Sequence, residues 1–347
     1  MTDVPRKTKK IGLFAIANAG DSEKEKIGIK NFQEYTGMEI LPYSVTPPGP
    51  RRFAGDDESR AKRFNALLNE PELDGLVAIR GGYGTTRILE QIDFEALRRK
   101  DCFVCGYSDI TALLLAAWKH GCRKLIHGPM IHSSWAIDPS SPTFQIEAES
   151  FLRVQGTEYR VQGLGNWPKD FYDNLKEPNK QSGEITQAIS PLSTCTLYPV
   201  PCTLLSQPSF LKSACTLYPV PSTLIPMNLT LLCALLGTSF MPDLTGTILA
   251  LEDISAPAHD IDRKLNQLRQ TGILQHLAGL IFGQFTDAED SEFLPEIRRE
   301  YAEYVHGPVI ENFPFGHSHP TLTLPFGEPV TISISADYSP NLTWHKN

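Results

Sequence analysis

The chain has 347 residues, 41% of them hydrophobic and 21% charged, a composition typical of a globular protein with room for two domains. The formal net charge of −8 argues against a nucleic-acid-binding surface, and no stretch is long and apolar enough to span a membrane. The N-terminus lacks the apolar core of a signal peptide, and the seven cysteines lie mainly in apolar runs, so we expect free thiols and a cytoplasmic location.

Strands and helices alternate along the first part of the chain. Apolar runs predict five strands, at residues 11–17, 39–45, 76–79, 102–105 and 124–126. Helix-compatible segments lie between them, at residues 23–36, 57–69 and from Thr111 onward. This alternation predicts an α/β fold with a doubly wound, flavodoxin-like parallel sheet covered on both faces. Cys102 and Cys105 have a zinc-like spacing, but no second pair of ligands accompanies them, so no metal is expected.

The segment after the fourth strand is a candidate site for a nucleophile. Residues 106–109 are Gly-Tyr-Ser-Asp and lie between an apolar strand and a helix, which is the arrangement of a nucleophile elbow. Such a turn exposes the serine Oγ at the sheet edge, near the free N–H groups of the helix N-terminus. Ile110 replaces the last glycine of the elbow motif, and Ser108 or Asp109 could instead be a helix cap.

A glycine-rich loop, residues 80–87, directly follows the third strand and is a second candidate. It lacks the lysine of a P-loop and the full spacing of a dinucleotide motif. It could be a plain turn, or its glycines could let the backbone approach a ligand and donate an N–H group. Because the carboxyl ends of neighbouring parallel strands converge, Gly82 and Ser108 could meet at one crevice.

The pattern weakens between residues 157 and 226. Residues 167–190 are polar and predict a linker, and the sequence of residues 195–204 is nearly repeated at residues 215–224. Each copy carries two prolines, which exclude a helix or a central strand, so we predict a loop. The chain is thus divided into an N-terminal α/β domain, a linker with a duplicated proline-rich insert, and a C-terminal domain, at residues 1–165, 166–227 and 228–347.

Regular structure is predicted again from Asn228, which can cap the next helix. Helices are expected at residues 229–236, 260–268 and 294–305, and strands at residues 247–251, 280–282, 321–324 and 330–334. Glu252 stands at a strand end and His317 follows Gly316. A strand-end carboxylate is often only a cap and a lone histidine is often structural, but serine acylation needs a base and an acid that orients it.

Several segments, in this order, resemble the LD-carboxypeptidases, a family of serine peptidases. The matching segments are residues 52–55 (Arg-Phe-Ala-Gly), 80–84 (Arg-Gly-Gly-Tyr-Gly) with Arg87, 106–109 with Thr111, 251–254 (Leu-Glu-Asp-Ile), 315–317 (Phe-Gly-His) and 323–327 (Thr-Leu-Pro-Phe-Gly). The resemblance covers nearly the whole chain except roughly residues 170–227. It implies an N-terminal α/β domain that carries the nucleophile and a C-terminal domain of mixed β-strands and helices that carries the acid and the base.

The resemblance also implies a catalytic triad and an oxyanion hole. These would be formed by the nucleophile Ser108, the base His317 and the acid Glu252, with the backbone N–H groups of Gly81, Gly82 and Asp109. His319 competes with His317 for the role of base, but His317 directly follows a glycine as in the family. One departure is Pro226-Met227, which stands where family members usually carry a glycine pair; because neither residue readily adopts φ > 0, we expect a remodelled domain crossing.

The implied activity is hydrolysis, through an acyl-enzyme, of the amide bond between an L-centre and a terminal D-amino acid, as in murein tetrapeptides. No metal or cofactor is required, the partner is a small peptide substrate, and a homodimer is expected because family members are often dimers. Two alternatives stay open. The chain could cleave the amide bond of a peptidyl- or aminoacyl-nucleotide of the microcin C type, or it could be a non-catalytic homologue that keeps the pocket.

Overall fold

The computed structural model of the chain describes residues 8–43, 48–155, 160–161, 215–216, 221–334 and 340–344. The chain divides into two compact units. The first comprises Met1–Phe144 and Ala234–Pro242, and the second comprises Gln145–Cys233 and Asp243–Asn347. The predicted linker, residues 166–227, lies mostly outside the described residues; of its duplicated insert, only residues 215–216 and 221–224 in the second copy are described.

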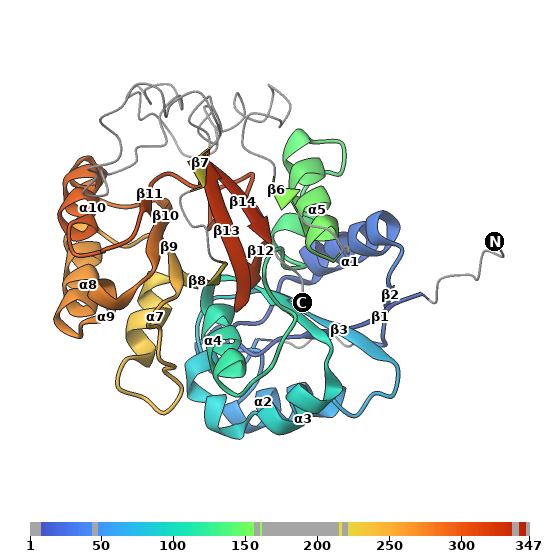
Figure 1. The fold of residues 1–347 in the computed structure, drawn as a ribbon. Coiled ribbons are helices and arrows are strands. Elements are labelled where there is room, and N and C mark those ends of the chain that lie inside the picture. The colour runs from blue at the N-terminus through green and yellow to red at the C-terminus, as the bar shows by residue number, and fades with distance from the viewer. Residues whose placement is uncertain are drawn as a thin grey trace. The chain divides into compact units, whose positions relative to one another are not determined.

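A parallel sheet forms the centre of the first unit (Figure 1). Its strands are β1 (Lys10–Phe14), β2 (Glu39–Ile40), β3 (Leu73–Ala78), β4 (Phe103–Gly106) and β5 (Leu125–His127). They pair in the order β2-β1-β3-β4-β5, and each of these pairings is parallel. This is the strand order of flavodoxin-like doubly wound sheets, which the sequence predicts. Of the strand predicted at residues 39–45, only β2 is found among the described residues.

A helix follows each strand of this sheet. These helices are α1 (Ser22–Thr36), α2 (Asp57–Leu67), α3 (Phe94–Lys100), α4 (Thr111–Lys119) and α5 (Pro142–Gln155), the last of which ends in the second unit. Side chains of aspartate cap the first three: Asp21, Asp56 and Asp93 accept hydrogen bonds from backbone N–H groups of the first turn. Gly37, with φ of 67°, ends α1, because glycine adopts this left-handed conformation without steric cost.

The short segment Ala234–Pro242 returns to the first unit. Its Phe240 ring lies 6.3 Å from the ring of Phe94. The Nζ atom of Lys119 donates hydrogen bonds to the backbone carbonyls of Ser239 at 2.7 Å and Met241 at 2.9 Å. An aromatic contact with Phe94 and two hydrogen bonds from Lys119, at the end of α4, therefore attach this segment to the rest of the first unit.

The second unit contains a mixed sheet. Its strands are β6 (Arg160–Val161), β7 (Cys215–Thr216), β8 (Ser222–Asn228), β9 (Ile248–Ile254), β10 (Gly279–Thr286), β11 (Val309–Ile310), β13 (Glu328–Ile334) and β14 (Pro340–Trp344). The order is β11-β10-β9-β8-β13-β14-β6, with β7 also paired to β13. Strands β8 to β11 pair in parallel, whereas the pairings of β13 and β14 are antiparallel. The predicted combination of a parallel α/β domain and a mixed domain is confirmed.

The described chain places four helices between strands of this sheet: α7 (Leu229–Leu235) follows β8, α8 (Ala258–Gln270) and α9 (Ile273–His276) follow β9, and α10 (Leu294–Ala302) follows β10. The predicted apolar face of α8 is buried, because Ile261, Leu265 and Leu268 are all fully shielded from solvent. Helix α10 ends three residues before the predicted Val305.

Two local predictions are wrong. The loop predicted up to Pro226 is replaced from residue 222 by β8, a strand paired on both sides. The proline is tolerated because pairing with β13 ends at Leu224, so Pro226 lies beyond that ladder. The strand predicted at residues 321–324 begins only at its last residue, since β12 spans Leu324–Phe326. The N–H groups of Thr321 and Thr323 instead donate to side chains on α5.

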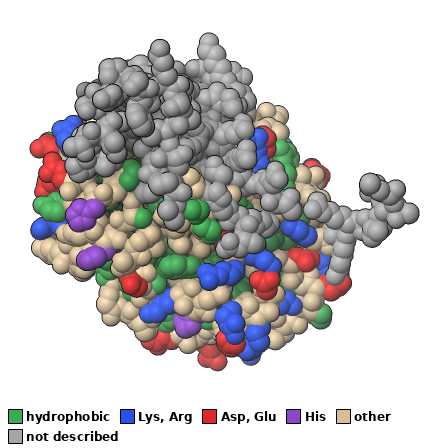
Figure 2. Space-filling view, viewed as in Figure 1, with side chains coloured by type: hydrophobic (Ala, Val, Ile, Leu, Met, Phe, Trp, Pro, Cys, Tyr) green, Lys and Arg blue, Asp and Glu red, His purple; other side chains and the backbone are tan. Residues whose placement is uncertain are grey.

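Charged side chains of both signs lie on the described surface that is visible in Figure 2. On the face in Figure 2, acidic and basic side chains lie interspersed. Such mixing of signs is typical of an ordinary protein surface. Among the described residues, every helix is too short or too polar to cross a membrane.

Candidate active site

Ser108 occupies a strained turn between β4 and α4. Its φ is 62°, in the left-handed region that a residue other than glycine rarely adopts, at a cost of about 1–3 kcal/mol. The 3₁₀-helix η4 (Ser108–Ile110) begins at this residue and leads into α4. Neither η4 nor α4 has a side-chain cap, so the helix-cap alternative for Ser108 and Asp109 does not describe this turn. A strained serine at a strand-to-helix turn is the geometry of a nucleophile elbow.

The glycine loop after β3 lies against this turn. A Cβ atom placed on Gly81 would lie 2.8 Å from the Cβ and 3.0 Å from the Oγ of Ser108, so only glycine fits there. Gly82 has a φ of 120°, and the next N–H group, that of Tyr83, donates to Oδ1 of Asn18 at 3.1 Å. Within the described residues, no backbone carbonyl accepts a hydrogen bond from Gly81 or Gly82. These two N–H groups could therefore serve an oxyanion.

Asp109 fixes the turn from inside the first unit. Its side chain is buried, and Oδ2 accepts a hydrogen bond from the backbone N–H of Thr85 at 2.8 Å. Burial raises the pKa of Asp109, while the hydrogen bonds from Thr85 act in the opposite direction. Thr85 begins the 3₁₀-helix η2 (Thr85–Arg87), so this bond joins the glycine loop to the Ser108 turn. The backbone N–H of Asp109 lies in the first turn of a helix, where N–H groups lack intrahelical acceptors.

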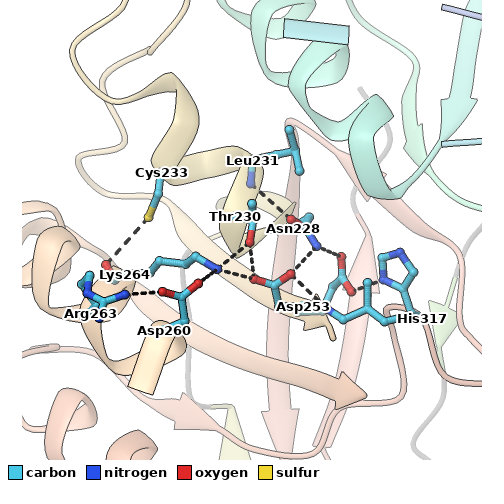
Figure 3. Close-up of polar contacts among 11 residues, drawn as sticks. Asn228, Thr230, Leu231, Cys233, Asp253, Asp260, Arg263, Lys264 and His317 are labelled. Atoms are coloured by element: carbon cyan, nitrogen blue, oxygen red, sulfur yellow. Dashed lines mark hydrogen bonds and ion pairs between the residues drawn. The ribbon is translucent and has the colours of Figure 1, made fainter. Parts of the chain in front are cut away.

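In the second unit, His317 and Glu252 form a close pair; Figure 3 shows His317 at one end of the polar network. Nδ1 of His317 lies 2.6 Å from Oε2 of Glu252. The glutamate is 0% exposed, and the histidine side chain is 11% exposed. Gly316, with φ of 122°, permits this approach, because a Cβ atom on it would lie 2.8 Å from the Cβ of Glu252. Gly316 is therefore required before His317 for a steric reason: a larger residue would collide with Glu252.

Glu252 lies in a strongly perturbed environment at the end of β9. Burial raises the pKa of its carboxyl group, and the hydrogen bond and charge of His317 act against this rise. The charge of Asp253 raises the pKa further, and the hydrogen bond from Asn228 lowers it. A fully buried carboxylate beside an imidazole is a frequent feature of catalytic sites.

Asn228 has a larger role than the helix cap predicted from the sequence. Its Oδ1 does accept from the backbone N–H of Leu231 at 3.2 Å, as a cap does. Its Nδ2 donates to Oε1 of Glu252 at 3.2 Å and to Oδ1 of Asp253 at 3.0 Å (Figure 3). The sequence carries no signal for this bridge except that Asp253 follows Glu252 directly. Only the parallel register, which pairs Asn228 with Glu252, brings the three side chains together.

His319, the competing histidine, bonds to a different carboxylate. Its Nδ1 lies 2.7 Å from Oε1 of Glu147 on α5, which also accepts from the backbone N–H of Thr321 at 3.0 Å. Burial opposes the charged imidazolium, but the hydrogen bond and charge of Glu147 outweigh it and raise the pKa of His319. Glu147 was not identified from the sequence, where it is one of several glutamates on a helix.

The structure therefore groups the predicted site residues into two sets. Ser108, Gly81, Gly82 and Asp109 lie together in the first unit, and Glu252 pairs with His317 in the second. The first set supplies a strained hydroxyl and two N–H groups, of Gly81 and Gly82, from which no described backbone carbonyl accepts a hydrogen bond. The second set supplies an imidazole that is hydrogen-bonded to a buried carboxylate.

Known proteins resemble this chain over most of its length. Residues 11–128 match the LD-carboxypeptidase N-terminal domain, and residues 222–332 match the LD-carboxypeptidase C-terminal domain. The chain belongs to the LD-carboxypeptidase family. Both matches contain candidate residues of this family member: Ser108 lies in the first match, and Glu252 and His317 lie in the second.

Curated relatives of this family member carry related names. The probable murein peptide carboxypeptidase of Bacillus subtilis is 26% identical over 332 residues, covering 94% of this chain and 89% of the relative. The murein tetrapeptide carboxypeptidase of Pseudomonas aeruginosa is 26% identical, over 81% of this chain and 80% of the length of that relative. The microcin C7 self-immunity protein MccF of Escherichia coli is 25% identical over 87% and 83%, respectively. These relatives support carboxypeptidase activity.

Solved structures share the fold. The muramoyltetrapeptide carboxypeptidase from Oxalobacter formigenes superposes with a TM-score of 0.73 at 24% identity, covering 97% of this chain and 99% of the other. MccF in complex with glutamyl sulfamoyl guanosine gives a TM-score of 0.77 at 21% identity, covering 97% and 96%. At such identities the likeness establishes the two-domain α/β architecture of the family.

Proposed function

We propose that this protein is a serine-type LD-carboxypeptidase that removes a terminal D-amino acid from a murein-type tetrapeptide. The observation that carries the proposal is the pairing of the fully buried Glu252 with His317, whose Nδ1 lies 2.6 Å from the carboxylate. A histidine held in this way presents its other ring nitrogen as a base. The strained turn at Ser108 supplies the matching nucleophile in the first unit.

The proposed reaction has two halves. Nε2 of His317 takes the proton of Ser108 as Oγ attacks the amide carbonyl, which requires the two atoms to come within about 2.6–3.2 Å. Glu252 holds the tautomer with the proton on Nδ1 and stabilises the imidazolium that forms. His317 then protonates the leaving amine, the C–N bond breaks, and the D-amino acid departs. Water, deprotonated by His317, attacks the acyl-enzyme and releases Ser108.

The oxyanion of the tetrahedral intermediate would lie against backbone N–H groups. No backbone carbonyl in the described chain accepts a hydrogen bond from the N–H groups of Gly81 and Gly82. Asp109 offers a third N–H group at the start of η4. In other enzymes, loss of one such donor costs about 3 kcal/mol of transition-state stabilisation. The proposed chemistry uses only side chains, backbone N–H groups and water.

A second candidate is hydrolysis of an acyl-sulfamoyl nucleotide. Structures of MccF, whose fold this chain shares, contain glutamyl sulfamoyl guanosine and aspartyl sulfamoyl adenosine. The same serine chemistry would apply to the amide bond of such a conjugate. We place the murein-type peptide first, because the names of the curated relatives favour it.

Release of D-alanine from an L,D-tetrapeptide by the full chain, followed by mass spectrometry, tests the proposal. We expect Ser108→Ala and His317→Ala to lower turnover by about a thousandfold or more, because each removes a member of the triad. Ser239→Ala and His306→Ala, at exposed positions, are the matched controls and should retain full activity. An active preparation whose Ser108→Ala variant keeps full turnover rules the proposal out.

Two further measurements separate the alternatives. A side-by-side assay on aspartyl sulfamoyl adenosine decides between the two substrate classes. Labelling of Ser108 by a serine-directed fluorophosphonate separates a hydrolase from a non-catalytic homologue, because only an activated serine reacts. The predicted homodimer is checked by light scattering on the same preparation.

A further inference from the structure

A second buried carboxylate lies directly beside the proposed catalytic acid. Asp253 is 3% exposed and Glu252 is 0% exposed, so both carboxyl groups are removed from solvent. Successive residues of a strand point to opposite faces, which would normally separate them. The Asp253 side chain instead turns toward the strand end, where its Oδ1 accepts from the backbone N–H of Ile254 at 3.0 Å. Two anionic groups thereby share one end of β9.

The amide of Asn228 links the two carboxylates (Figure 3). Its Nδ2 donates to Glu252 Oε1 at 3.2 Å and to Asp253 Oδ1 at 3.0 Å. A side-chain amide has two N–H donors, so each carboxylate receives one. The orientation is fixed, because Oδ1 of Asn228 accepts from Leu231 and a flipped amide would place an oxygen against two carboxylates. A displacement of Asp253 would therefore move the Asn228 amide and, through it, the carboxylate of Glu252.

Lys264 of α8 balances the charge of Asp253. Its Nζ lies 3.4 Å from Oδ2 of Asp253 and donates to Oγ1 of Thr230 at 2.7 Å, and this hydroxyl donates to the same Oδ2 at 2.7 Å. The lysine side chain is only 15% exposed, so solvent screens its charge poorly. Lys264 also lies 3.4 Å from Oδ2 of Asp260, one helical turn away. The lysine thus neutralises the anion adjacent to Glu252.

Three elements of the second unit carry charged groups in the Asn228 network or beside the loop of His317. Glu252 and Asp253 belong to β9, Lys264 and Asp260 belong to α8, and Glu147 on α5 pairs with His319 of the loop that carries His317. Glu147 bonds to His319 and to the backbone N–H of Thr321, whereas Asn228 bonds to Glu252 and Asp253. Asp253 and Lys264 are charged groups that the Asn228 network connects to Glu252, the partner of His317.

We propose that Asp253 and Lys264 are positioning residues that orient Glu252 through Asn228 and set the proton affinity of His317. The inference rests on the proposed function, in which His317 must be neutral to accept the proton of Ser108. Removal of the lysine charge leaves an unbalanced anion, which favours the imidazolium. Removal of the Asp253 charge has the opposite effect.

The pH dependence of kcat/KM tests this sign difference. The rate rises with pH as His317 loses its proton. We expect Lys264→Met to move this rise to higher pH and Asp253→Asn to move it to lower pH, each by about half a unit. Lys264→Arg, which keeps the charge, should stay near the parent profile. Arg263→Met is the matched control: its side chain is 70% exposed and pairs with Asp260 rather than Asp253, so no shift is expected.

A second measurement keeps the inference apart from the proposed function. In the Ser108→Ala background, the NMR titration of the His317 imidazole reports its pKa without turnover. Opposite shifts in Lys264→Met and Asp253→Asn support the inference even if no peptide is cleaved. Shifts of the same sign, or none in the folded Lys264→Met variant, overturn it even if the peptidase activity is established. Should Asp253→Asn fail to fold, the contrast between Lys264→Met and Lys264→Arg decides.

Discussion

Nδ1 of His317 lies 2.6 Å from Oε2 of Glu252, a carboxylate that is fully shielded from solvent. The two residues come from β9 and from a loop 65 positions later in the chain. Gly316 makes the approach possible, because any side chain at that position would collide with Glu252. This pair gives the proposed mechanism its base and the acid that orients it.

Replacing Glu252 by glutamine should abolish most turnover while preserving the packing. The new amide N–H can donate to Nδ1 of His317, which stabilises the tautomer with the proton on Nε2, and this tautomer cannot accept the serine proton. We expect kcat to fall by about a hundredfold or more. Steady-state kinetics of D-alanine release measure it, with the exposed Glu303→Gln variant as control. Unchanged kcat in Glu252→Gln contradicts the assigned role.

A methyl group at Gly81 should displace the nucleophile. The added Cβ would lie 2.8 Å from the Cβ of Ser108, closer than such atoms approach in proteins. We expect Gly81→Ala to lower both kcat and the rate of fluorophosphonate labelling about tenfold or more. Gly37→Ala is the control, because it strains a φ of 67° in open space and should cost only about 1 kcal/mol of stability. Equal labelling rates for Gly81→Ala and the parent protein would contradict this prediction.

Arg60 is a buried cation that supports the glycine loop, and its loss should destabilise the first unit. Its guanidinium donates to the backbone carbonyls of Ile16 and Gly84, pairs with Asp57 and lies 4.5 Å from the ring centre of Phe53. Arg60→Ala leaves a cavity and unpaired carbonyls, for which we expect a loss of about 2–4 kcal/mol. Urea unfolding followed by circular dichroism measures it. The exposed Lys62→Ala variant should stay within about 0.5 kcal/mol of the parent, and a similar value for Arg60→Ala refutes the prediction.

The stability of the second unit should depend on pH through His319. Glu147 raises the pKa of this histidine above the ordinary value of 6.5, despite the opposing effect of burial. The folded state therefore binds the proton more tightly, so the stabilisation is complete below the unfolded pKa and is lost as pH rises through the folded pKa. His319→Gln should lower the urea midpoint more at about pH 5.5 than at about pH 8.5.

The control for that comparison is His306→Gln. His306 is exposed, and within the described residues its ring bonds to the uncharged backbone carbonyl of Gln275, so its effect on the urea midpoint should be the same at both pH values. A His319→Gln effect that is equal at both pH values, or larger at high pH, contradicts the assigned charge pair.

Local sequence patterns were sufficient for the architecture of the first unit. Apolar runs that alternate with helix-compatible segments predict parallel strands, and β1, β3, β4 and β5 lie within or overlap the predicted ranges. The strand–glycine–serine–helix order around Ser108 likewise predicts a turn, and the structure adds its φ of 62°. These features are local, because hydrophobic periodicity and turn chemistry act over a few residues.

Contacts between distant residues had to come from the fold. Asn228 appears in the sequence only as a helix cap, and its bridge between Glu252 and Asp253 depends on the register of β8 against β9. The start of β8 at Ser222 was missed for a related reason, since Pro226 is acceptable only because β13 pairs no further than Leu224.

The sequence by itself determined the fold class, because hydrophobic periodicity within single segments predicts strands and helices. It also placed candidate polar residues at the ends of predicted strands. Only the tertiary structure decided that the acid at position 252 bonds to His317, whereas His319 bonds to Glu147. A buried carboxylate must find a donor to offset its desolvation, and which donor it finds depends on how strands and loops pack. Spacing along the chain carries no record of that choice.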